Sequence, residues 1–390
     1  NHTESEEITI TIIDKTAPAA PAVNKIFDAS TTLTGKAEAG STVSAKVSNK
    51  EIGKATAKSD GTFEIKIAKQ SAGTEITVTA TDKAGNESAP TTITVQSQFD
   101  RISGYMRYDT AIEVSKRGWD TAETVILARG DDFADALAGV PLAYKLDAPI
   151  LMTPVNKLWD NTLTEIERLG AKNVIVLGGK GAVSDTIVNK LVNDGLKVRR
   201  IAGKSRFDTA ALIATEMAPK GTDKVVVANG MDFPDALSVA SQAAKEGLPI
   251  LLTMDDRLPA ATTAKVKQLA VKETIVVGGK SVVSEKIKAQ LPKPVRLSGS
   301  DRYKTNIAIA EHFGVESKHL YVATGQNYAD ALTGAVLAAK DDSTILLVHH
   351  KVPAAVESFL KKQHPHSLSI FGGEGAVSKV IENELKKQLP

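Results

Sequence analysis

The sequence of 390 residues has no cysteine, few aromatic residues and no long apolar run. Without cysteine there are no disulfides, no thiol nucleophile and no thiolate metal site, which suits export in organisms that do not rely on disulfides. No apolar run approaches the roughly 18 residues that a membrane-spanning helix needs. The formal net charge is only +2, which argues against a dedicated nucleic-acid binder. The length predicts two to four globular domains, at about 100–200 residues each.

Residues 1–97 alternate apolar and polar side chains in short runs separated by turn residues. The runs are Ile8–Ile12, Thr42–Val47, Thr62–Ile67 and Glu75–Ala80. A period of two residues predicts strands with one buried and one solvated face. Because no helical period interrupts these runs, the segment is predicted to be an antiparallel β-sandwich.

The same segment resembles bacterial immunoglobulin-like surface domains from about residue 15 to residue 97. The motifs that carry the resemblance are Asp14–Pro18, Leu33–Val43, Ser59–Phe63 and Val78–Asn86. It implies an all-β immunoglobulin-like sandwich that serves as a rigid spacer or an adhesion module, with a possible surface or host partner. Some relatives of this kind bind calcium near domain junctions. Asp14 and Asp82 are the candidates here, and the favoured alternative is that both form turns and caps.

Residues 101–390 repeat one unit three times, which changes how every motif in it is interpreted. Each unit opens with Arg-Ile/Leu-x-Gly and then carries Arg-aromatic-x-Thr, aromatic-x-Asp-Ala-Leu, Gly-Gly and Val-Ser. The openings are Arg101–Gly104, Arg200–Gly203 and Arg296–Gly299. The aromatic-x-Asp-Ala-Leu motifs are Phe133–Leu137, Phe233–Leu237 and Tyr328–Leu332.

Within the first unit, strand patterns alternate with helix patterns. Val125–Ala128 and Pro149–Met152 are short apolar runs, typical of strands covered on both faces. Asp132–Lys145 and Thr162–Leu169 have helical spacing. Ser184 is expected to cap the next helix by accepting a bond from one of its first N–H groups. This alternation predicts an open, doubly wound parallel sheet in each unit.

The motifs of residues 101–390 resemble the cell wall binding repeat type 2 family of Gram-positive bacteria. Its members occur as triplets in clostridial surface-layer-associated proteins and in amidase modifier proteins. The resemblance implies three tandem α/β Rossmann-like open-sheet repeats in a pseudo-three-fold arrangement. The implied function is non-enzymatic, non-covalent anchoring to an anionic secondary polymer of the cell wall, a teichoic-acid-like polymer or a wall polysaccharide. The expected domains are the sandwich at 1–97 and repeats at 98–195, 196–294 and 295–390.

The expected location follows from the same resemblance: a secreted protein of the cell wall or cell surface, with no membrane span, nucleic acid or cofactor. No signal-peptide pattern is visible at Asn1, so we expect that any targeting segment was removed or was never present. The third repeat departs most from the pattern. Lys304 replaces the aspartate found at Asp109 and Asp208, so this repeat is expected to be the most divergent binder.

Glycine pairs between a strand and a helix start are the first candidate polymer-binding residues. Glycine allows close backbone approach, and a helix N-terminus offers free N–H groups to a phosphate or carboxylate. Such loops lie at the carboxyl ends of parallel strands, where ligands bind in open sheets. A tight turn without a ligand is the competing interpretation. The candidates are Gly178, Gly179, Gly278, Gly279, Gly372 and Gly373, with the following serines Ser184, Ser284 and Ser378.

Three recurring arginines, Arg107, Arg206 and Arg302, are the second candidate set. A planar guanidinium suits two-point contact with phosphate or carboxylate. The alternative, equally weighted, is a structural bridge between repeats, with the recurring aspartates as ion-pair partners. These are Asp135, Asp235 and Asp330. The recurring threonines Thr110, Thr209 and Thr305 are expected to cap, or else to bond sugar hydroxyls.

The sequence shows no catalytic constellation. Six of the seven histidines lie in the third repeat and none recurs, so they do not belong to a shared site. No copy has the G-x-G-x-x-G spacing, a P-loop or a G-x-S-x-G elbow. We therefore predict no catalytic residues and no metal. The rival functions are an accessory or modifier of a wall hydrolase and a nucleotide-sugar-binding enzyme on a Rossmann-like scaffold.

Overall fold

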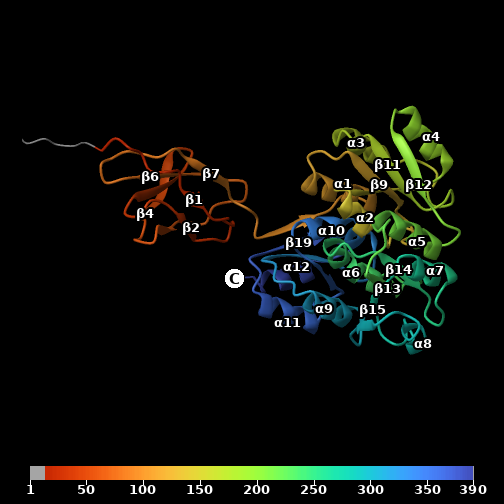
Figure 1. Ribbon diagram of the computed structural model, residues 1–390. Helices are drawn as coiled ribbons and strands as arrows, with labels where there is room; N and C mark the ends of the chain where they lie inside the picture. The colour runs from red at the N-terminus through yellow and green to blue at the C-terminus, as the bar shows by residue number, and fades with distance from the viewer. Residues whose placement is uncertain (1–13, 390) are drawn as a thin grey trace, which may run out of the picture. The chain divides into compact units, whose positions relative to one another are not determined.

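A computed structural model describes residues 14–389, and the chain divides into two compact units, Asn1–Gln98 and Phe99–Pro390 (Figure 1). The first unit contains strands and the second alternates strands with helices. The strand predicted at Ile8–Ile12 lies outside the described residues.

The described residues of the first unit, 14–98, form two antiparallel sheets, ordered β1-β2-β5 and β4-β3-β6-β7. Its strands are Ala22–Val23 (β1), Thr32–Lys36 (β2), Thr42–Val47 (β3), Lys50–Thr56 (β4), Thr62–Lys66 (β5), Glu75–Thr81 (β6) and Thr91–Thr94 (β7). Alternate residues of these strands point inward, so that Val43, Ile65 and Ile76 are fully buried between the sheets. The strands predicted at 42–47, 62–67 and 75–80 are confirmed, because each alternating run buries one face.

The two calcium candidates of the first unit form local turns. The Asp14 carboxylate accepts a hydrogen bond from the Thr16 N–H (2.9 Å). The Asp82 carboxylate accepts bonds from the backbone and side-chain amide of Asn86 (2.9 and 2.8 Å). The same side-chain amide donates to the Asp14 carbonyl. Among the described residues no cluster of three or more metal-ligating side chains is found.

The second unit contains three four-stranded parallel sheets within its described part. The first sheet has the order β10-β9-β11-β12, with Thr124–Arg129 (β9), Ile150–Thr153 (β10), Asn173–Leu177 (β11) and Lys197–Ile201 (β12). The second has the order β14-β13-β15-β16, with Lys224–Asn229 (β13), Ile250–Thr253 (β14), Glu273–Val277 (β15) and Pro294–Leu297 (β16). The third has the order β18-β17-β19-β8, with Phe99–Ile102 (β8), His319–Thr324 (β17), Ile345–Val348 (β18) and Ser367–Phe371 (β19).

Each sheet takes its fourth strand from the opening motif of another repeat. β12 and β16 follow directly along the chain, whereas β8 lies at the start of the second unit and completes the last sheet. Ile102 of β8 pairs with Phe371 of β19. The sheets are therefore offset by one strand from the sequence repeats, and the two ends of the second unit meet in one sheet.

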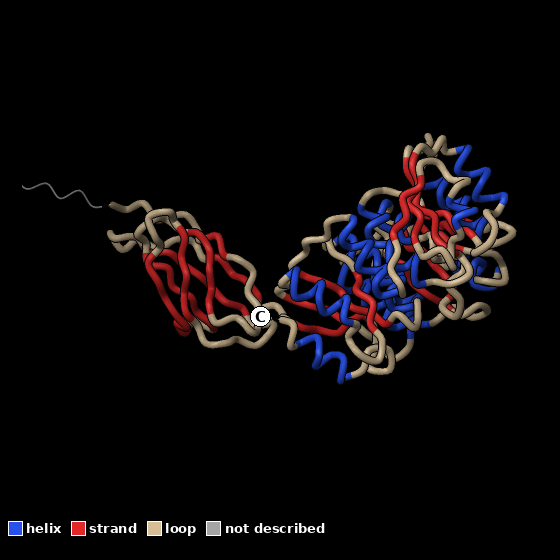
Figure 2. The backbone as a smooth tube through the Cα atoms, turned by 90° about the horizontal axis from the view of Figure 1, so that it is seen from below, coloured by secondary structure: helices blue, strands red, loops and turns tan. Residues whose placement is uncertain are grey.

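Three central helices, one from each repeat, pack on one another: Val140–Lys145 (α2), Pro234–Lys245 (α6) and Ala329–Lys340 (α10) (Figures 1 and 2). Alanines such as Ala240 and Ala335 are fully buried there, because small side chains let helix backbones approach closely. The other helices are Arg107–Gly118 (α1), Asp160–Arg168 (α3), Asp185–Asn193 (α4), Arg206–Met217 (α5), Ala260–Gln268 (α7), Glu285–Lys288 (α8), Arg302–His312 (α9), Ala354–Gln363 (α11) and Lys379–Lys386 (α12).

The helix predicted at Asp132–Lys145 is wrong in its first half. Residues 134–138 form turns, and α2 begins only at Val140. Pro141 explains the difference, because it has no N–H for the Leu137 carbonyl and its ring would clash with that carbonyl in a continuous helix. The corresponding residue in α6 is Ser241, and that helix begins at Pro234.

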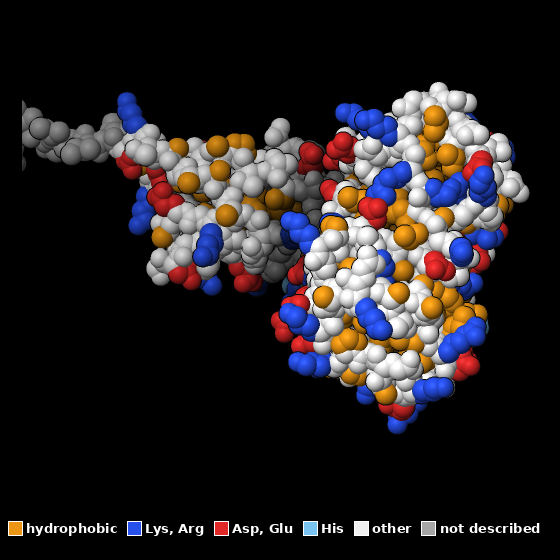
Figure 3. Space-filling view, turned by 45° about the vertical axis from the view of Figure 1, so that its right-hand side comes forward, with side chains coloured by type: hydrophobic (Ala, Val, Ile, Leu, Met, Phe, Trp, Pro, Cys, Tyr) orange, Lys and Arg blue, Asp and Glu red, His pale blue; other side chains and the backbone are white. Residues whose placement is uncertain are grey.

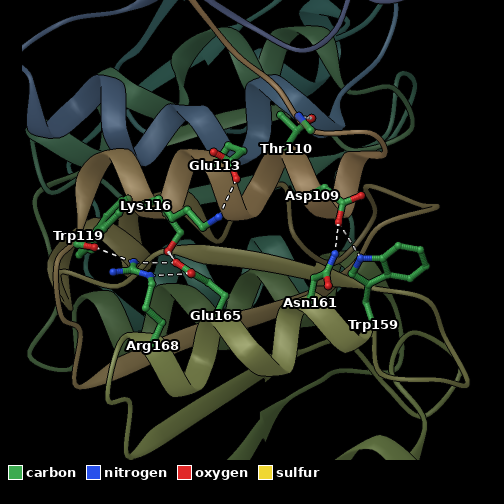
Figure 4. A network of polar contacts seen from close by, with 11 residues as sticks. Asp109, Thr110, Glu113, Lys116, Trp119, Trp159, Asn161, Glu165 and Arg168 are labelled. Carbon is green, nitrogen blue, oxygen red and sulfur yellow. Dashed lines mark hydrogen bonds and ion pairs between the residues drawn. The ribbon is translucent and has the colours of Figure 1, made fainter. Parts of the chain in front are cut away.

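The contact between α1 and α3 explains one aspartate of the repeated motif (Figure 4). The Asp109 carboxylate accepts hydrogen bonds from Trp159 Nε1 and Asn161 Nδ2 (2.9 and 3.0 Å). At the other end of the contact, the buried Glu165 accepts two bonds from Arg168. Asp109 thus makes hydrogen bonds inside the first repeat. Lys304, which occupies the same position in the third repeat, therefore changes internal contacts there.

Candidate functional site

The carboxyl ends of the three parallel sheets bring the predicted residues together in three clusters, here called edge sites 1, 2 and 3. Edge site 1 comprises Asp135, Gly178, Gly179, Ser184 and Arg206. Edge site 2 comprises Asp235, Gly278, Gly279, Ser284 and Arg302. Edge site 3 comprises Asp330, Gly372, Gly373, Ser378 and Arg107. Each arginine comes from a different repeat than the glycine pair, because it stands directly after the fourth strand of the sheet, which another repeat supplies.

The first glycine of each pair is required by the protein's own packing. Gly178, Gly278 and Gly372 have φ values of 93°, 112° and 100°, a region that favours glycine. A Cβ at any of them would collide with the carboxylate of the edge-site aspartate. Their N–H groups donate to carbonyls of the fourth strand at 2.9 Å, so these groups are already used inside the sheet.

The second glycine of each pair is accessible. Gly179, Gly279 and Gly373 are partly exposed, and a Cβ on any of them would meet no atom within 4 Å. The residue that follows differs between the edge sites: it is Lys180, Lys280 or Glu374. The open face of each glycine loop therefore carries a cation at edge sites 1 and 2 and an anion at edge site 3.

The serines cap their helices at two edge sites only. Ser284 and Ser378 accept hydrogen bonds from the N–H groups of Ile287 and Ile381 (3.3 and 3.4 Å). Ser184 precedes α4 but makes no such bond, and its Oγ is buried without a partner. The cap predicted at Ser184 is therefore wrong, because its hydroxyl is enclosed but does not reach the first turn of α4.

The three candidate arginines bridge adjacent repeats. The Nη1 atoms of Arg107, Arg206 and Arg302 donate to the carbonyls of Gly130, Gly230 and Gly325 at 2.6, 2.7 and 2.6 Å. Their guanidinium groups lie 5.8, 5.4 and 5.8 Å from the ring centroids of Tyr328, Phe133 and Phe233, each of which belongs to a different repeat from its arginine. Such stacking adds a cation–π attraction. None of the three is fully buried, and the Arg302 side chain keeps 32% of its exposure.

The three rings under these arginines pack against one another, which the sequence interpretation missed. Phe133, Phe233 and Tyr328 form a triangle of edge-to-face contacts with centroid distances of 5.5 to 5.9 Å. Edge-to-face geometry brings positive ring edges onto negative ring faces. The aromatic residue that opens each aromatic-x-Asp-Ala-Leu motif was the available signal.

A second arginine set, in the opening motifs, holds the glycine loops and was not predicted. Arg101, Arg200 and Arg296 donate through Nη1 to the carbonyls of Gly372, Gly178 and Gly278. Their Nη2 atoms pair with carboxylates of the helix that follows the loop. The partners are Glu382 at 2.9 Å, Asp185 at 3.4 Å and Glu285 at 3.3 Å. The first position of each repeat therefore sets the shape of an edge site.

The half-buried aspartates behind the glycine loops of edge sites 2 and 3 have shifted pKa values. Burial and the nearby Asp232 raise the pKa of Asp235 to about 6, although Arg302 opposes the shift. Burial also raises the pKa of Asp330, against a hydrogen bond from Thr110 and the charge of Arg107. The alternative of an ion pair with the edge-site aspartate takes another form at edge site 2, where Arg302 pairs with Asp232 at 3.7 Å and acts on Asp235 through its charge.

The threonines of the repeated motif are committed to internal hydrogen bonds. The hydroxyls of Thr110, Thr209 and Thr305 accept from the N–H groups of Gly104, Gly203 and Gly299 at 3.1, 3.1 and 2.9 Å. They tie the loop after the fourth strand to the next helix, and these bonds are not helix caps, because the donors Gly104, Gly203 and Gly299 precede the helices.

Two adjoining cavities open at edge site 3. One of about 370 Å³ is lined by Gln326, His349, His350, Glu374 and Ser378. The other, of about 240 Å³, is lined by residues that include Tyr105, Met106, Arg107, Asp330 and Gly373. Asn327, Asp330 and Gly375 line both cavities, so they form one continuous hollow at the end of the third sheet. Two of the residues predicted to bind polymer, Arg107 and Gly373, line the smaller of these cavities.

Comparison with protein families identifies both units. Residues 17–97 match the bacterial Ig domain, and residues 101–188, 200–288 and 296–382 match the cell wall binding domain 2. Since the second match covers more than half of the chain, the protein belongs to the cell wall binding domain 2 family, with a bacterial Ig domain ahead of three repeats. Both predicted resemblances are confirmed.

Individual relatives cover the repeats. The N-acetylmuramoyl-L-alanine amidase LytC of Bacillus subtilis (strain 168) is 37% identical over 287 residues, 73% of this chain and 58% of the relative. The amidase enhancer of the same organism is 36% identical over 290 residues, 73% of this chain and 40% of the relative. The chain thus spans about half the length of these relatives.

Among solved structures, Cwp6 from Clostridium difficile is similar in fold, with a TM-score of 0.72 at 22% identity over 95% of this chain and 67% of that one. Cwp8 from the same organism has a TM-score of 0.69 at 25% identity over 83% of this chain and 60% of that one. In the described part of the chain no helix is long and apolar enough to cross a membrane.

Proposed function

We propose that the three repeats anchor the protein non-covalently to an anionic secondary polymer of the Gram-positive cell wall. The observation that carries the proposal is the threefold recurrence of an accessible glycine loop beside a half-buried arginine at the carboxyl edge of a parallel sheet. Open α/β sheets bind ligands at this edge. A polymer presents many copies of one unit, and linked weak sites raise avidity by about 10²–10⁴-fold.

Lysines on the glycine loops supply the charge for an anionic unit in this proposal. Lys180 keeps 79% of its side-chain exposure although it pairs with Asp185, and Lys280 is also exposed. Acidic and basic side chains are interspersed over the face of the repeats seen in Figure 3. Binding is therefore local to the edge sites, and it weakens with salt without collapsing as it would for a polycation.

The proposal extends to organisation and place. The protein acts by binding, outside the cell at the wall, with the Ig-like unit as spacer or adhesion module for a surface partner. The sequence repeats run over 98–195, 196–294 and 295–390, each Rossmann-like, after a first domain at 1–97. A pseudo-three-fold axis through the Phe133, Phe233 and Tyr328 rings relates them, supported by the near-equal ring distances.

The test is retention of the protein on purified walls before and after acid extraction of the secondary polymers. We expect retention on intact walls and loss of retention on extracted walls. Equal retention on both would overturn the polymer proposal. Replacement of Arg107, Arg206 and Arg302 by Gln separates their two roles, because polymer contact lowers retention whereas bridging lowers the melting temperature.

A second candidate function is modification of a wall hydrolase. It is favoured by the similarity to the amidase enhancer, which covers 73% of this chain. The measurement is the rate of wall lysis by a purified amidase with and without the protein. An enhanced rate on extracted walls, to which the protein is not anchored, would support this candidate over simple anchoring.

A further inference from the structure

Tyr105 and Met106 form an exposed apolar tip at edge site 3. Tyr105 is 98% exposed and Met106 is 44% exposed. At the other two edge sites the corresponding positions carry polar side chains: Lys204, Ser205, Ser300 and Asp301. Solitary exposed apolar residues are ordinary, but an aromatic ring held over a polar cavity indicates a binding surface.

The tip lies beside two cavities that share Tyr105, Met106 and Arg107. One is the 240 Å³ part of the hollow at edge site 3. The other, of about 470 Å³, is also lined by Tyr108 and Asp131. Behind Tyr108, the Trp159 ring follows at a centroid distance of 5.0 Å. The tip therefore continues an aromatic surface that begins at Trp159, just before α3, and ends at the hollow.

The polar groups around this tip differ in charge from those of the other edge sites. Glu374 stands where edge sites 1 and 2 have Lys180 and Lys280, and the half-buried Asp330 faces the same hollow. The amides Gln326 and Asn327 also line it. The two carboxylates offset the positive charge of Arg107 in the same hollow, so the site does not favour an anionic group, whereas amides and carboxylates suit the hydroxyls of an uncharged ligand.

We propose that edge site 3 binds an uncharged pyranose ring of the wall glycan, stacked on Tyr105, while edge sites 1 and 2 take the anionic units. A pyranose ring has a face of C–H groups and a rim of hydroxyls. The apolar face of Tyr105 fits the first, and Asn327 and Asp330, which line the same cavity as Tyr105, fit the second. This division of labour rests on the proposed wall-anchoring function and assigns a ligand class to one of its sites.

The experiment measures equilibrium binding to purified walls at low and at high NaCl for four proteins: wild type, Tyr105→Ala, Tyr105→Phe and Lys180→Gln/Lys280→Gln. We expect Tyr105→Ala to weaken binding about tenfold at both salt concentrations. The reason is that salt screens interactions between charges but does not weaken the contact of a buried tyrosine ring with its ligand. Tyr105→Phe keeps the ring and binds like wild type. The double lysine variant loses affinity mainly at low salt, where exposed charges act.

Val192→Ala is the matched control, because Val192 is 50% exposed on α4 outside the edge sites. It should bind like wild type, and all variants should keep the melting temperature of wild type. If wild-type protein binds equally to intact walls and to walls from which the secondary polymers have been extracted, the anchoring proposal itself is overturned. Unchanged binding by Tyr105→Ala, with wild type retained, overturns only the sugar-stacking proposal and leaves the tip to a protein partner. A loss confined to low salt would also overturn it.

Discussion

The third sheet of the repeats and the first sheet are built from the same motifs, but they are completed differently. β12 completes the first sheet directly after β11 and α4, whereas β8 reaches the third sheet from the other end of the unit. The ion pair at the junction differs accordingly. Glu382 beside Arg101 keeps only 6% of its side-chain exposure, whereas Asp185 beside Arg200 keeps 46%. The closing junction is thus the more deeply buried one, and there the protein depends most on a single strand.

The largest expected effect is at this closing junction. Arg101→Gln should lower the free energy of unfolding by about 3 kcal/mol, because it leaves a buried carboxylate with fewer partners. Arg200→Gln, the matched variant of the first sheet, should cost less than about 1 kcal/mol, since its ion pair is exposed. Urea denaturation of both variants makes the measurement. Equal losses of unfolding free energy in the two variants would mean that the junction between β8 and the third sheet contributes no more than the corresponding junction of the first sheet.

The same junction gives a dependence on acid. Burial opposes ionisation of Glu382, but hydrogen bonds from Lys379, Lys386 and Arg101 outweigh it and hold the pKa at about 2. Because the folded pKa lies below the ordinary carboxyl value of 4.5, this stabilisation is complete above that value and is lost as the pH falls toward about 2. In Arg101→Gln this loss on acidification should be smaller than in wild type.

An effect of similar size separates edge site 2 from edge site 1. The folded pKa of Asp235 is raised from 3.8 to about 6, so the folded state binds more protons than the unfolded chain between these values. Stability therefore falls by about 3 kcal/mol as the pH rises through this window, since each pKa unit corresponds to about 1.4 kcal/mol. Asp235→Asn should abolish the fall, measured by thermal unfolding at a series of pH values, and Asp135→Asn serves as the control. A wild-type profile that is flat through the window would contradict the prediction.

The helix caps should differ by about 1 kcal/mol. Ser284→Ala and Ser378→Ala each remove a cap and are expected to lower stability by that amount. Ser184→Ala removes a buried hydroxyl without a partner and should leave stability unchanged or slightly raised. Chemical denaturation of the three variants measures the difference. A loss at Ser184 equal to the others would show that its hydroxyl does cap α4.

The smallest expected effect concerns charge at the glycine loops. Glu374→Lys makes edge site 3 resemble edge sites 1 and 2, and should strengthen wall binding about two- to fivefold at low salt. The gain should disappear at high salt because the new charge is exposed. Lys280→Glu is the reciprocal variant, with the opposite sign. Retention on walls across a salt series tests the pair, and no change in either variant would exclude the loops from polymer contact.

Local patterns predicted the elements of the fold well where the pattern itself decides the structure. Runs such as Val125–Ala128 are buried strands because all-apolar segments need cover on both faces. Local patterns gave a wrong prediction at Asp132–Lys145, where Pro141 interrupts the helix. They were also wrong at Ser184, where side-chain geometry decides whether the hydroxyl caps the helix. The candidate glycines and arginines were found by recurrence, but the roles of Arg101, Arg200 and Arg296 were missed because each acts on a loop of a different repeat.

The sequence by itself determined that one α/β unit is used three times after a β-sandwich, because periodicity and turn residues are written locally. Only the tertiary structure decided that each opening arginine serves the glycine loop of another repeat, and that β8 completes the sheet of the last repeat. Arg101 and the Gly372 carbonyl it bonds are 271 residues apart. Pairing between such distant segments depends on how whole sheets and central helices pack, which no local pattern encodes.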